Sequence, residues 1–229
     1  MRYAIYFTPP AEAPLTRAAS NWLGRDAFTD ATIAQTAVEG ISPQRLLELT
    51  ADPRRYGFHA TLKAPFELAS GQTEADLLAA FSAFCAKQSA FEIPKAVIGQ
   101  LGKFYALVPE ETYQPLQDFA SAVVQVFEPF RAPLSPEDMA RRKPEKLSQA
   151  ERNNLERWGY PYVFDAFRFH MTLSGQVPEA EAPAVGAALD RHFAGLVPMP
   201  LAVNGLGLFR EETRGTAFTV QTWLPLAGA

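Results

Sequence analysis

Hydrophobic and polar residues alternate along several short segments of the chain, and this two-residue period predicts β-strands. A first strand is predicted over Tyr3–Phe7, and the alternating pattern Phe-His-x-Thr-Leu occurs twice, at residues 58–62 (the first motif) and 169–173 (the second motif). In a strand, the His and Thr of each motif point to one face and the three apolar residues to the other. Further strands are predicted over residues 93–101, 104–108, 200–209 and 217–224.

Other segments carry apolar residues at a helical period. The clearest is Thr112–Phe127, in which a stripe of apolar residues recurs every three to four positions. A helix over residues 42–49 is predicted to begin with Ser42 as its N-cap and Pro43 at its first helical position. Helices are also predicted over residues 16–22, 74–87, 136–142, 148–158 and 179–193.

The two motifs begin a repeated order of elements. Each is followed by one predicted helix and two predicted strands, and Val97–Phe104 resembles Val203–Phe209 with one residue deleted. We therefore interpret the chain as two copies of one α+β unit, at about residues 52–128 and 163–229. The proline-rich segment 129–162 is interpreted as an insertion or linker, and strand 3–7 as completing the sheets. A single bilobal domain over residues 1–229 is the expected organisation.

Composition narrows the classes of partner. The net charge of −4 and a pI near 5.5 argue against extended nucleic acids and anionic membranes as partners, because both attract basic proteins. Cys85 is the single cysteine, so no intrachain disulfide can form, which fits a reducing cytoplasm. No targeting or membrane-spanning segment is evident, and a soluble, cytoplasmic protein is expected. The oligomeric state is left open.

The motif histidines are the strongest candidates for chemistry. Packing alone does not require the same His-x-Thr pair in both units, so we expect His59 and His170 to share one site. Opening a cyclic phosphodiester needs a base for the attacking water and an acid for the leaving oxygen, and two imidazoles can divide these roles. Thr61 and Thr172 would hydrogen-bond the nonbridging oxygens. Which histidine is the base stays open at this point.

Four further residues are candidates for substrate binding. Strand alternation places Lys63 on the face of Thr61 and Arg168 on the face of His170, where each could add positive charge; the alternative is a solvated or ion-paired side chain. Tyr56 and Tyr105 could line the cleft and stack on a sugar or base, with a core position as the alternative. The basic run at residues 141–143 is interpreted as solvated surface, although the insertion could bring it over the cleft.

Two other kinds of site are disfavoured. Zinc binding would have to rely mainly on carboxylates, because the chain has three histidines, one cysteine and no close His/Cys spacing. A serine nucleophile would require a Gly-x-Ser-x-Gly elbow, which the sequence lacks. We therefore expect no metal and no cofactor.

The motifs and their surroundings resemble a known family. Two His-x-Thr motifs in a repeated α+β unit resemble the two-histidine (2H) phosphoesterase superfamily. Residues 2–7, 22–26, 55–66, 157–162 and 167–173 are similar to the subfamily encoded beside bacterial phosphonate-utilisation genes. The resemblance spans nearly the whole chain. It implies a bilobal α+β fold with pseudo-two-fold symmetry, antiparallel sheets lining a central cleft with helices outside, and metal-independent chemistry on a phosphodiester.

Two classes of function follow. The first is a hydrolase that opens a small cyclic phosphate of nucleotide or phosphoribosyl type, in phosphonate metabolism by association. An RNA 2′,3′-cyclic phosphodiesterase or ligase is a variant of it. The second class is a non-catalytic module that binds a phosphorylated ligand or an RNA end. A matched acid and base favour the enzyme, and the low basic content favours a small substrate.

Overall fold

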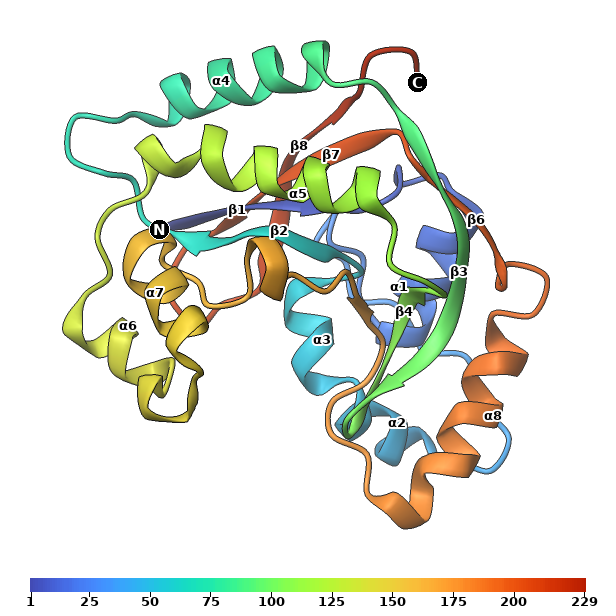
Figure 1. Cartoon of the computed structure of the whole chain (residues 1–229). Coiled ribbons are helices and arrows are strands. Elements are labelled where there is room, and N and C mark those ends of the chain that lie inside the picture. The colour runs from blue at the N-terminus through green and yellow to red at the C-terminus, as the bar shows by residue number, and fades with distance from the viewer.

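The computed structural model describes all residues from 1 to 229. Its strands form one eight-stranded antiparallel sheet with the order β6-β3-β4-β5-β2-β1-β7-β8 (Figure 1). The α+β class and the antiparallel pairing expected from the sequence are confirmed. The strands are β1 (Arg2–Phe7), β2 (Ala60–Phe66), β3 (Phe91–Leu101), β4 (Phe104–Pro109), β5 (Met171–Thr172), β6 (Met199–Val203), β7 (Gly205–Glu211) and β8 (Phe218–Pro225).

The sheet is continuous but strongly curled, because one extended segment, residues 199–211, contributes strands near both of its edges. Residues 200–209, predicted as a single strand, are divided at Asn204 into β6 and β7. β6 pairs with β3 at one edge, whereas β7 lies between β1 and β8 toward the other edge. Near the C-terminus, residue Ala227 also pairs with the segment before β3 through Gln88 and Ala90. The single predicted strand is thus replaced by two strands that tie the two ends of the sheet together.

The helices cover the sheet unequally. They are α1 (Pro14–Leu23), α2 (Pro43–Leu49), α3 (Ala51–Tyr56), α4 (Glu74–Lys87), α5 (Gln114–Val126), α6 (Pro136–Arg141), α7 (Gln149–Trp158) and α8 (Ala182–His192). The main hydrophobic core contains side chains from α1, α4, α5 and α8 together with the apolar faces of both motifs. Buried members of this core include Trp22, Leu62, Phe81, Phe119, Met171 and Leu189. These four helices therefore lie on the apolar side of the motifs.

Side chains of β1 alternate between two clusters. Tyr3, Ile5 and Phe7 enter the main core, whereas Ala4 and Tyr6 point to the opposite face. There they form a second, smaller cluster with residues of β7, β8 and the loop after α1, namely Ala27, Phe209 and Phe218. This second cluster forms an apolar floor on the face to which the motif His and Thr point.

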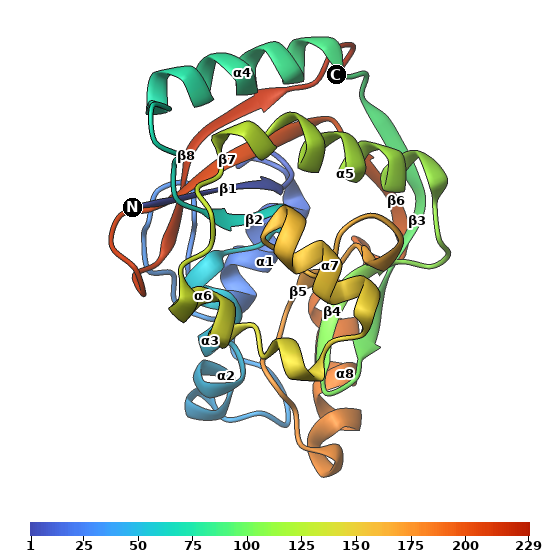
Figure 2. The same ribbon diagram turned by 60° about the vertical axis from the view of Figure 1, so that its left-hand side comes forward.

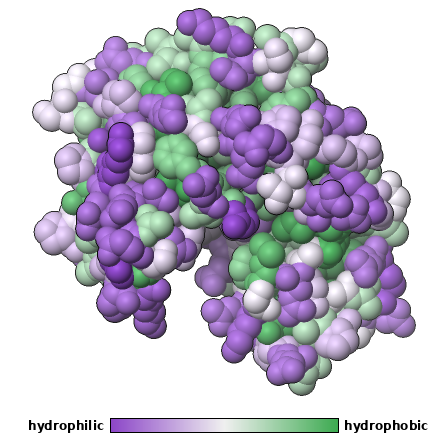
Figure 3. Space-filling view, in the orientation of Figure 1, coloured by the Kyte–Doolittle hydropathy of each residue, from purple (hydrophilic) through white to green (hydrophobic).

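The insertion folds as predicted into two helices, α6 and α7. Ser135 and Ser148 cap them by accepting hydrogen bonds from the backbone N–H groups of Asp138 and Glu151. In Figure 2, α7 lies in front of β5 and below α5. Figure 3 shows the molecule hollowed between the α6–α7 side and the α2–α8 side, with hydrophilic residues on both rims.

Candidate active site

The two motifs lie side by side at the centre of the sheet, where β2 pairs with β5. The pair is antiparallel, with Ala60 opposite Met171. Because pairing on either side of this point continues in opposite directions, His59 lies across from Thr172 and Thr61 across from His170. The two histidines and the two threonines thus occupy the diagonals of one four-residue group.

This group faces a cavity, and the apolar motif residues face the core. His59, Thr61, His170 and Thr172 are all half-buried and line a cavity of 370 Å³. Their sequence neighbours are the buried ones: Ala60 is 1% exposed and Met171 is fully buried. We call this space the motif cavity. The structure therefore brings the two histidines to one cavity.

Both imidazoles are held in the same way. His59 places Nδ1 3.0 Å from the carbonyl oxygen of Gly57, and His170 places Nδ1 2.8 Å from that of Arg168, two residues upstream in each case. A carbonyl oxygen can only accept a hydrogen bond, so Nδ1 carries a proton in both rings. Nε2 is thereby left to exchange protons. The hydroxyl of Thr61 lies 3.4 Å from Nε2 of His59.

Gly57 has a backbone that only glycine tolerates here. Its φ is 76°, and an added Cβ would lie 2.5 Å from the Cβ of Ala27. The carbonyl that fixes His59 comes from this residue, which follows directly after α3. The end of α3 therefore sets the orientation of the first imidazole.

The two histidines have different surroundings. The ring of His59 lies 4.1 Å from that of Tyr6, 5.6 Å from that of Tyr56 and 6.2 Å from that of Phe209, between centroids. The ring of His170 has one aromatic neighbour, Phe104, at 5.9 Å. Burial disfavours the charged imidazolium and lowers the pKa of His59 to about 4. The hydrogen bond to Gly57 acts in the opposite direction and raises this pKa, whereas the proximity of His170 lowers it further. His59 is therefore neutral at pH 7.

The structure brings only part of the predicted binding set to the motif cavity. Tyr56 lines it and stacks on His59. Arg168 lies next to it, on a smaller cavity of 120 Å³ that shares Thr61 and His170, and its Nη1 donates to the carbonyl of Phe167 at 2.7 Å. Lys63 and Tyr105 do not reach the motif cavity.

Lys63 is turned away by an irregularity in β2. The register of β1 against β2 shifts between Tyr6↔Thr61 and Ile5↔Lys63, which is a β-bulge that breaks the alternation of faces. The Lys63 ammonium, 3% exposed, donates to the carbonyl of Val124 at 3.0 Å and pairs with Glu128. The prediction that Lys63 shares the face of Thr61 is wrong for this reason, and Lys63 instead ties β2 to α5.

Tyr105 takes the core position that was its alternative. It is 8% exposed, belongs to the main core, and donates its hydroxyl to the carbonyl of Ala182 at 2.7 Å. It therefore joins β4 to the start of α8 and cannot stack on a ligand in the motif cavity.

Several lining residues were not selected from the sequence. Tyr6 and Arg2 come from β1, and Arg142 and Tyr160 come from the insertion. The guanidinium of Arg142 lies 5.0 Å above the ring of Tyr160. The basic run at 141–143 was interpreted as surface, and its alternative placement over the cleft holds for Arg142. The signal that pointed to it was the position of a basic run inside a long insertion.

No group of three or more His, Cys, Asp or Glu side chains is placed to hold a metal ion. No helix is both long enough and apolar enough to cross a membrane.

A family model described as "Protein of unknown function (DUF1045)" matches residues 61–219. Two curated relatives carry the name "Ribose 1,5-bisphosphate phosphokinase PhnN". The one from Janthinobacterium sp. (strain Marseille) is 39% identical over 99% of this chain and 51% of its own length. The one from Laribacter hongkongensis (strain HLHK9) is 34% identical over the whole of this chain and 53% of its own length. The chain thus spans about half the length of the curated relatives it matches.

Solved structures with similar chains include E. coli LigT complexed with 3′-AMP, at 16% identity and a TM-score of 0.43, covering 99% of this chain and 97% of that one. They also include TT0787 of Thermus thermophilus, at 16% identity and a TM-score of 0.46, covering 99% and 98%.

Proposed function

The chain belongs to the DUF1045 family, and for this member we propose a metal-independent phosphodiesterase that opens a small cyclic phosphate of nucleotide or phosphoribosyl type. The observation that carries the proposal is the group formed by His59, Thr61, His170 and Thr172 on one face of the β2–β5 pair. This grouping also supports the resemblance to the two-histidine phosphoesterases.

The unlike surroundings of the histidines suggest their roles. In the proposed reaction, neutral His59 accepts a proton from the attacking water through Nε2. Protonated His170 donates its Nε2 proton to the leaving oxygen as the bond from phosphorus to that oxygen breaks. One proton is taken up and one is released, so the pair returns to its starting state when the two rings exchange protons with solvent.

Other side chains would stabilise the charge that develops on phosphorus-bound oxygens. Thr61 and Thr172 donate their hydroxyls to the nonbridging oxygens in this scheme. Arg2 and Arg142, which line the motif cavity, supply the positive charge that Lys63 was expected to give. Tyr56 and Tyr6 provide an apolar wall beside His59 for a sugar or base.

The name of the curated relatives specifies a phosphokinase, but a phosphodiesterase fits the half of those proteins that this chain matches. The chain has no Gly-x-x-x-x-Gly-Lys-Ser/Thr loop of the type that holds nucleotide phosphates in P-loop enzymes. We infer that the kinase activity named for those proteins belongs to the half that this chain does not match. A sugar phosphate as the substrate class agrees with their name.

The decisive experiment compares histidine and threonine variants on a panel of cyclic phosphates. His59→Ala and His170→Ala should each lower kcat by about 10²- to 10⁴-fold, since each removes one proton-transfer step. Thr61→Ala and Thr172→Ala should lower it less. Circular dichroism checks that the variants fold, and full activity of either histidine variant would remove the mechanism. Loss of activity on chelation, restored by one divalent ion, would contradict metal independence.

A further inference from the structure

A second cavity adjoins the motif cavity. It measures 400 Å³ and shares four lining residues with the motif cavity, Arg2, Tyr56, Pro65 and Arg142. The residues that line only this cavity come from α3, the end of β2, the insertion and the loop between β7 and β8. Five arginines line it, namely Arg2, Arg55, Arg141, Arg142 and Arg214. We call this space the arginine annex.

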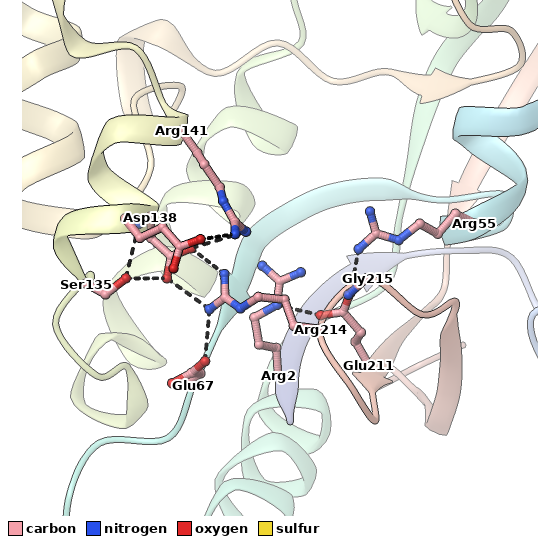
Figure 4. A network of polar contacts seen from close by, with 10 residues as sticks. Arg2, Arg55, Glu67, Ser135, Asp138, Arg141, Glu211, Arg214 and Gly215 are labelled. Carbon is pink, nitrogen blue, oxygen red and sulfur yellow. Dashed lines mark hydrogen bonds and ion pairs between the residues drawn. The ribbon is translucent and has the colours of Figure 1, made fainter.

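Two of these arginines are neutralised by the protein. Arg214 pairs with Asp138 and, at 2.9 Å, with Glu67, and so links the β7–β8 loop to β2 and α6 (Figure 4). Arg141 pairs with Glu137 on its own helix and reaches Asp138 at 4.0 Å. These contacts build the wall of the annex and leave little charge for a ligand.

Arg2 and Arg55 are held in place but keep free donors. Both converge on the carboxylate of Glu211, which is fully buried and also accepts the backbone N–H of Gly215 at 2.9 Å (Figure 4). Burial would raise the pKa of Glu211, but the hydrogen bonds from Arg2, Gly215 and Arg55 outweigh it and hold that pKa below its usual value. Arg2 uses only Nε for this contact. Arg55 uses Nη2, with Nε bonded to the carbonyl of Thr216, so its Nη1 is unengaged.

Arg142 is free altogether. Its guanidinium forms no hydrogen bond and no ion pair with the protein, and it rests on the ring of Tyr160 at 5.0 Å. Arg2, Arg55 and Arg142 carry three positive charges, and Glu211 carries one negative charge. The junction of the two cavities therefore has an excess of two positive charges. The chain as a whole carries −4, so this excess is local.

We propose that the arginine annex binds a second anionic phosphate group of the substrate whose cyclic diester lies in the motif cavity. A phosphate monoester carries close to two negative charges and accepts paired N–H donors from guanidinium groups. Arg2 and Arg142 line both cavities, so one small molecule can reach the histidines and the annex together. The substrate class is then a small molecule with one cyclic phosphodiester and one phosphate monoester. This inference rests on the proposed function for the motif cavity.

The test uses two probes that differ by one phosphate: adenosine 2′,3′-cyclic phosphate with and without a 5′-phosphate. Binding is measured by calorimetry in the His170→Ala background, in which consumption of the probes should be about 10²- to 10⁴-fold slower. The 5′-phosphorylated probe should bind about 10- to 100-fold more tightly, as expected for hydrogen bonds to charged groups. Arg55→Met should abolish this advantage, because Arg55 lines the annex and not the motif cavity. The methionine side chain can still pack over Tyr56, as the Arg55 side chain does.

Three further variants sharpen the result. Arg142→Met should also remove the advantage without touching the Glu211 contacts. Arg55→Lys keeps the charge and should retain part of it. Arg17→Met, on an exposed position of α1, is the matched control and should retain all of it.

Equal affinity for the two probes, or an advantage that survives both Arg55→Met and Arg142→Met, would overturn the annex assignment. Turnover by the unmodified chain is scored separately. Turnover of both probes without a difference in binding would leave the phosphodiesterase standing and remove the annex. A binding difference that depends on Arg55 without any turnover would do the reverse.

Discussion

At the scale of single residues, two motifs of the same pattern give two histidines in different environments. The rings of Tyr6, Tyr56 and Phe209 surround His59, whereas His170 has only Phe104 beside it. The sequence could not assign the base because the motifs themselves are alike. The proposed assignment depends on β1, α3 and β7, whose aromatic side chains reach His59 only in the folded protein.

This difference predicts the pH dependence of catalysis. The pKa of His59 lies at about 4, so its base form is present across the neutral range, and kcat/KM should rise as the pH increases through about 4. It should fall again at higher pH when the acid of the pair loses its proton, giving a bell-shaped profile whose two limbs belong to the coupled pair. Bound phosphate favours charged imidazoles, so the kcat profile should lie at higher pH than the kcat/KM profile. Initial rates from pH 3.5 to 9 test this, and activity confined below pH 4 would reverse the two roles.

A second prediction concerns Gly57. In Gly57→Ala, the new methyl group meets Ala27 and the positive φ is strained, so the carbonyl that fixes His59 must move. We expect kcat to fall at least about 10-fold with a smaller change in KM, because a positioning role acts on the transition state. Gly71→Ala is the control: its φ is 83° but nothing lies within 4 Å of the added Cβ. An equal loss of kcat in both variants would mean a general effect of strain.

At the scale of elements, capping and periodicity predicted most of the fold. The helix over 74–87 has the predicted bounds, and Ser42 caps α2 as expected, accepting from the N–H of Arg45. Three features were beyond the pattern. Residues 51–56 form α3, the second motif contributes only the two-residue β5, and the segment 200–209 is divided at Asn204. The two strand features depend on tertiary partners, since strand boundaries are set by pairing and not by local periodicity alone.

Because the bulge in β2 turns Lys63 away from the motif cavity, we predict that Lys63 contributes to stability and not to catalysis. The Lys63 ammonium is buried between β2 and α5, and burial lowers its pKa while Glu128 opposes this. Lys63→Met should leave kcat/KM within about twofold of the original and lower the free energy of unfolding by about 1–3 kcal/mol, because Glu128 keeps its ion pair with Arg131. Denaturant unfolding and steady-state kinetics measure the two effects. A selective rise in KM without loss of stability would return Lys63 to the binding set.

At the scale of the whole molecule, the two lobes share their strands. The first motif lies in the half of the sheet that contains β7 and β8, which come from the second predicted unit. The second motif lies beside β4 and β3, which come from the first. The duplication could be read from sequence because both motifs and their following elements recur. The exchange of strands could not, because it depends on which edges pair.

Strand exchange predicts a single unfolding transition. Neither lobe keeps its sheet when the other unfolds. Leu107→Ala in β4 and Leu208→Ala in β7 should therefore each lower the free energy of unfolding by about 2–5 kcal/mol and shift the midpoint of the same single transition. Far-ultraviolet circular dichroism and tryptophan fluorescence should give coincident curves. Two separated transitions, one sensitive to each variant, would show that the lobes unfold independently.

The step from β6 to β7 at Asn204 also orders events during synthesis. β1 is translated before the other strands, but the strand that pairs with its outer edge comes some 200 residues later, as Gly205–Glu211. At about 5–20 residues per second the ribosome needs roughly 10–40 s to supply it. Throughout that interval the nascent chain presents an unpaired strand edge, which is the kind of surface that recruits other chains. Protection of β1 before β7 arrives is thus a requirement that this topology places on the cell.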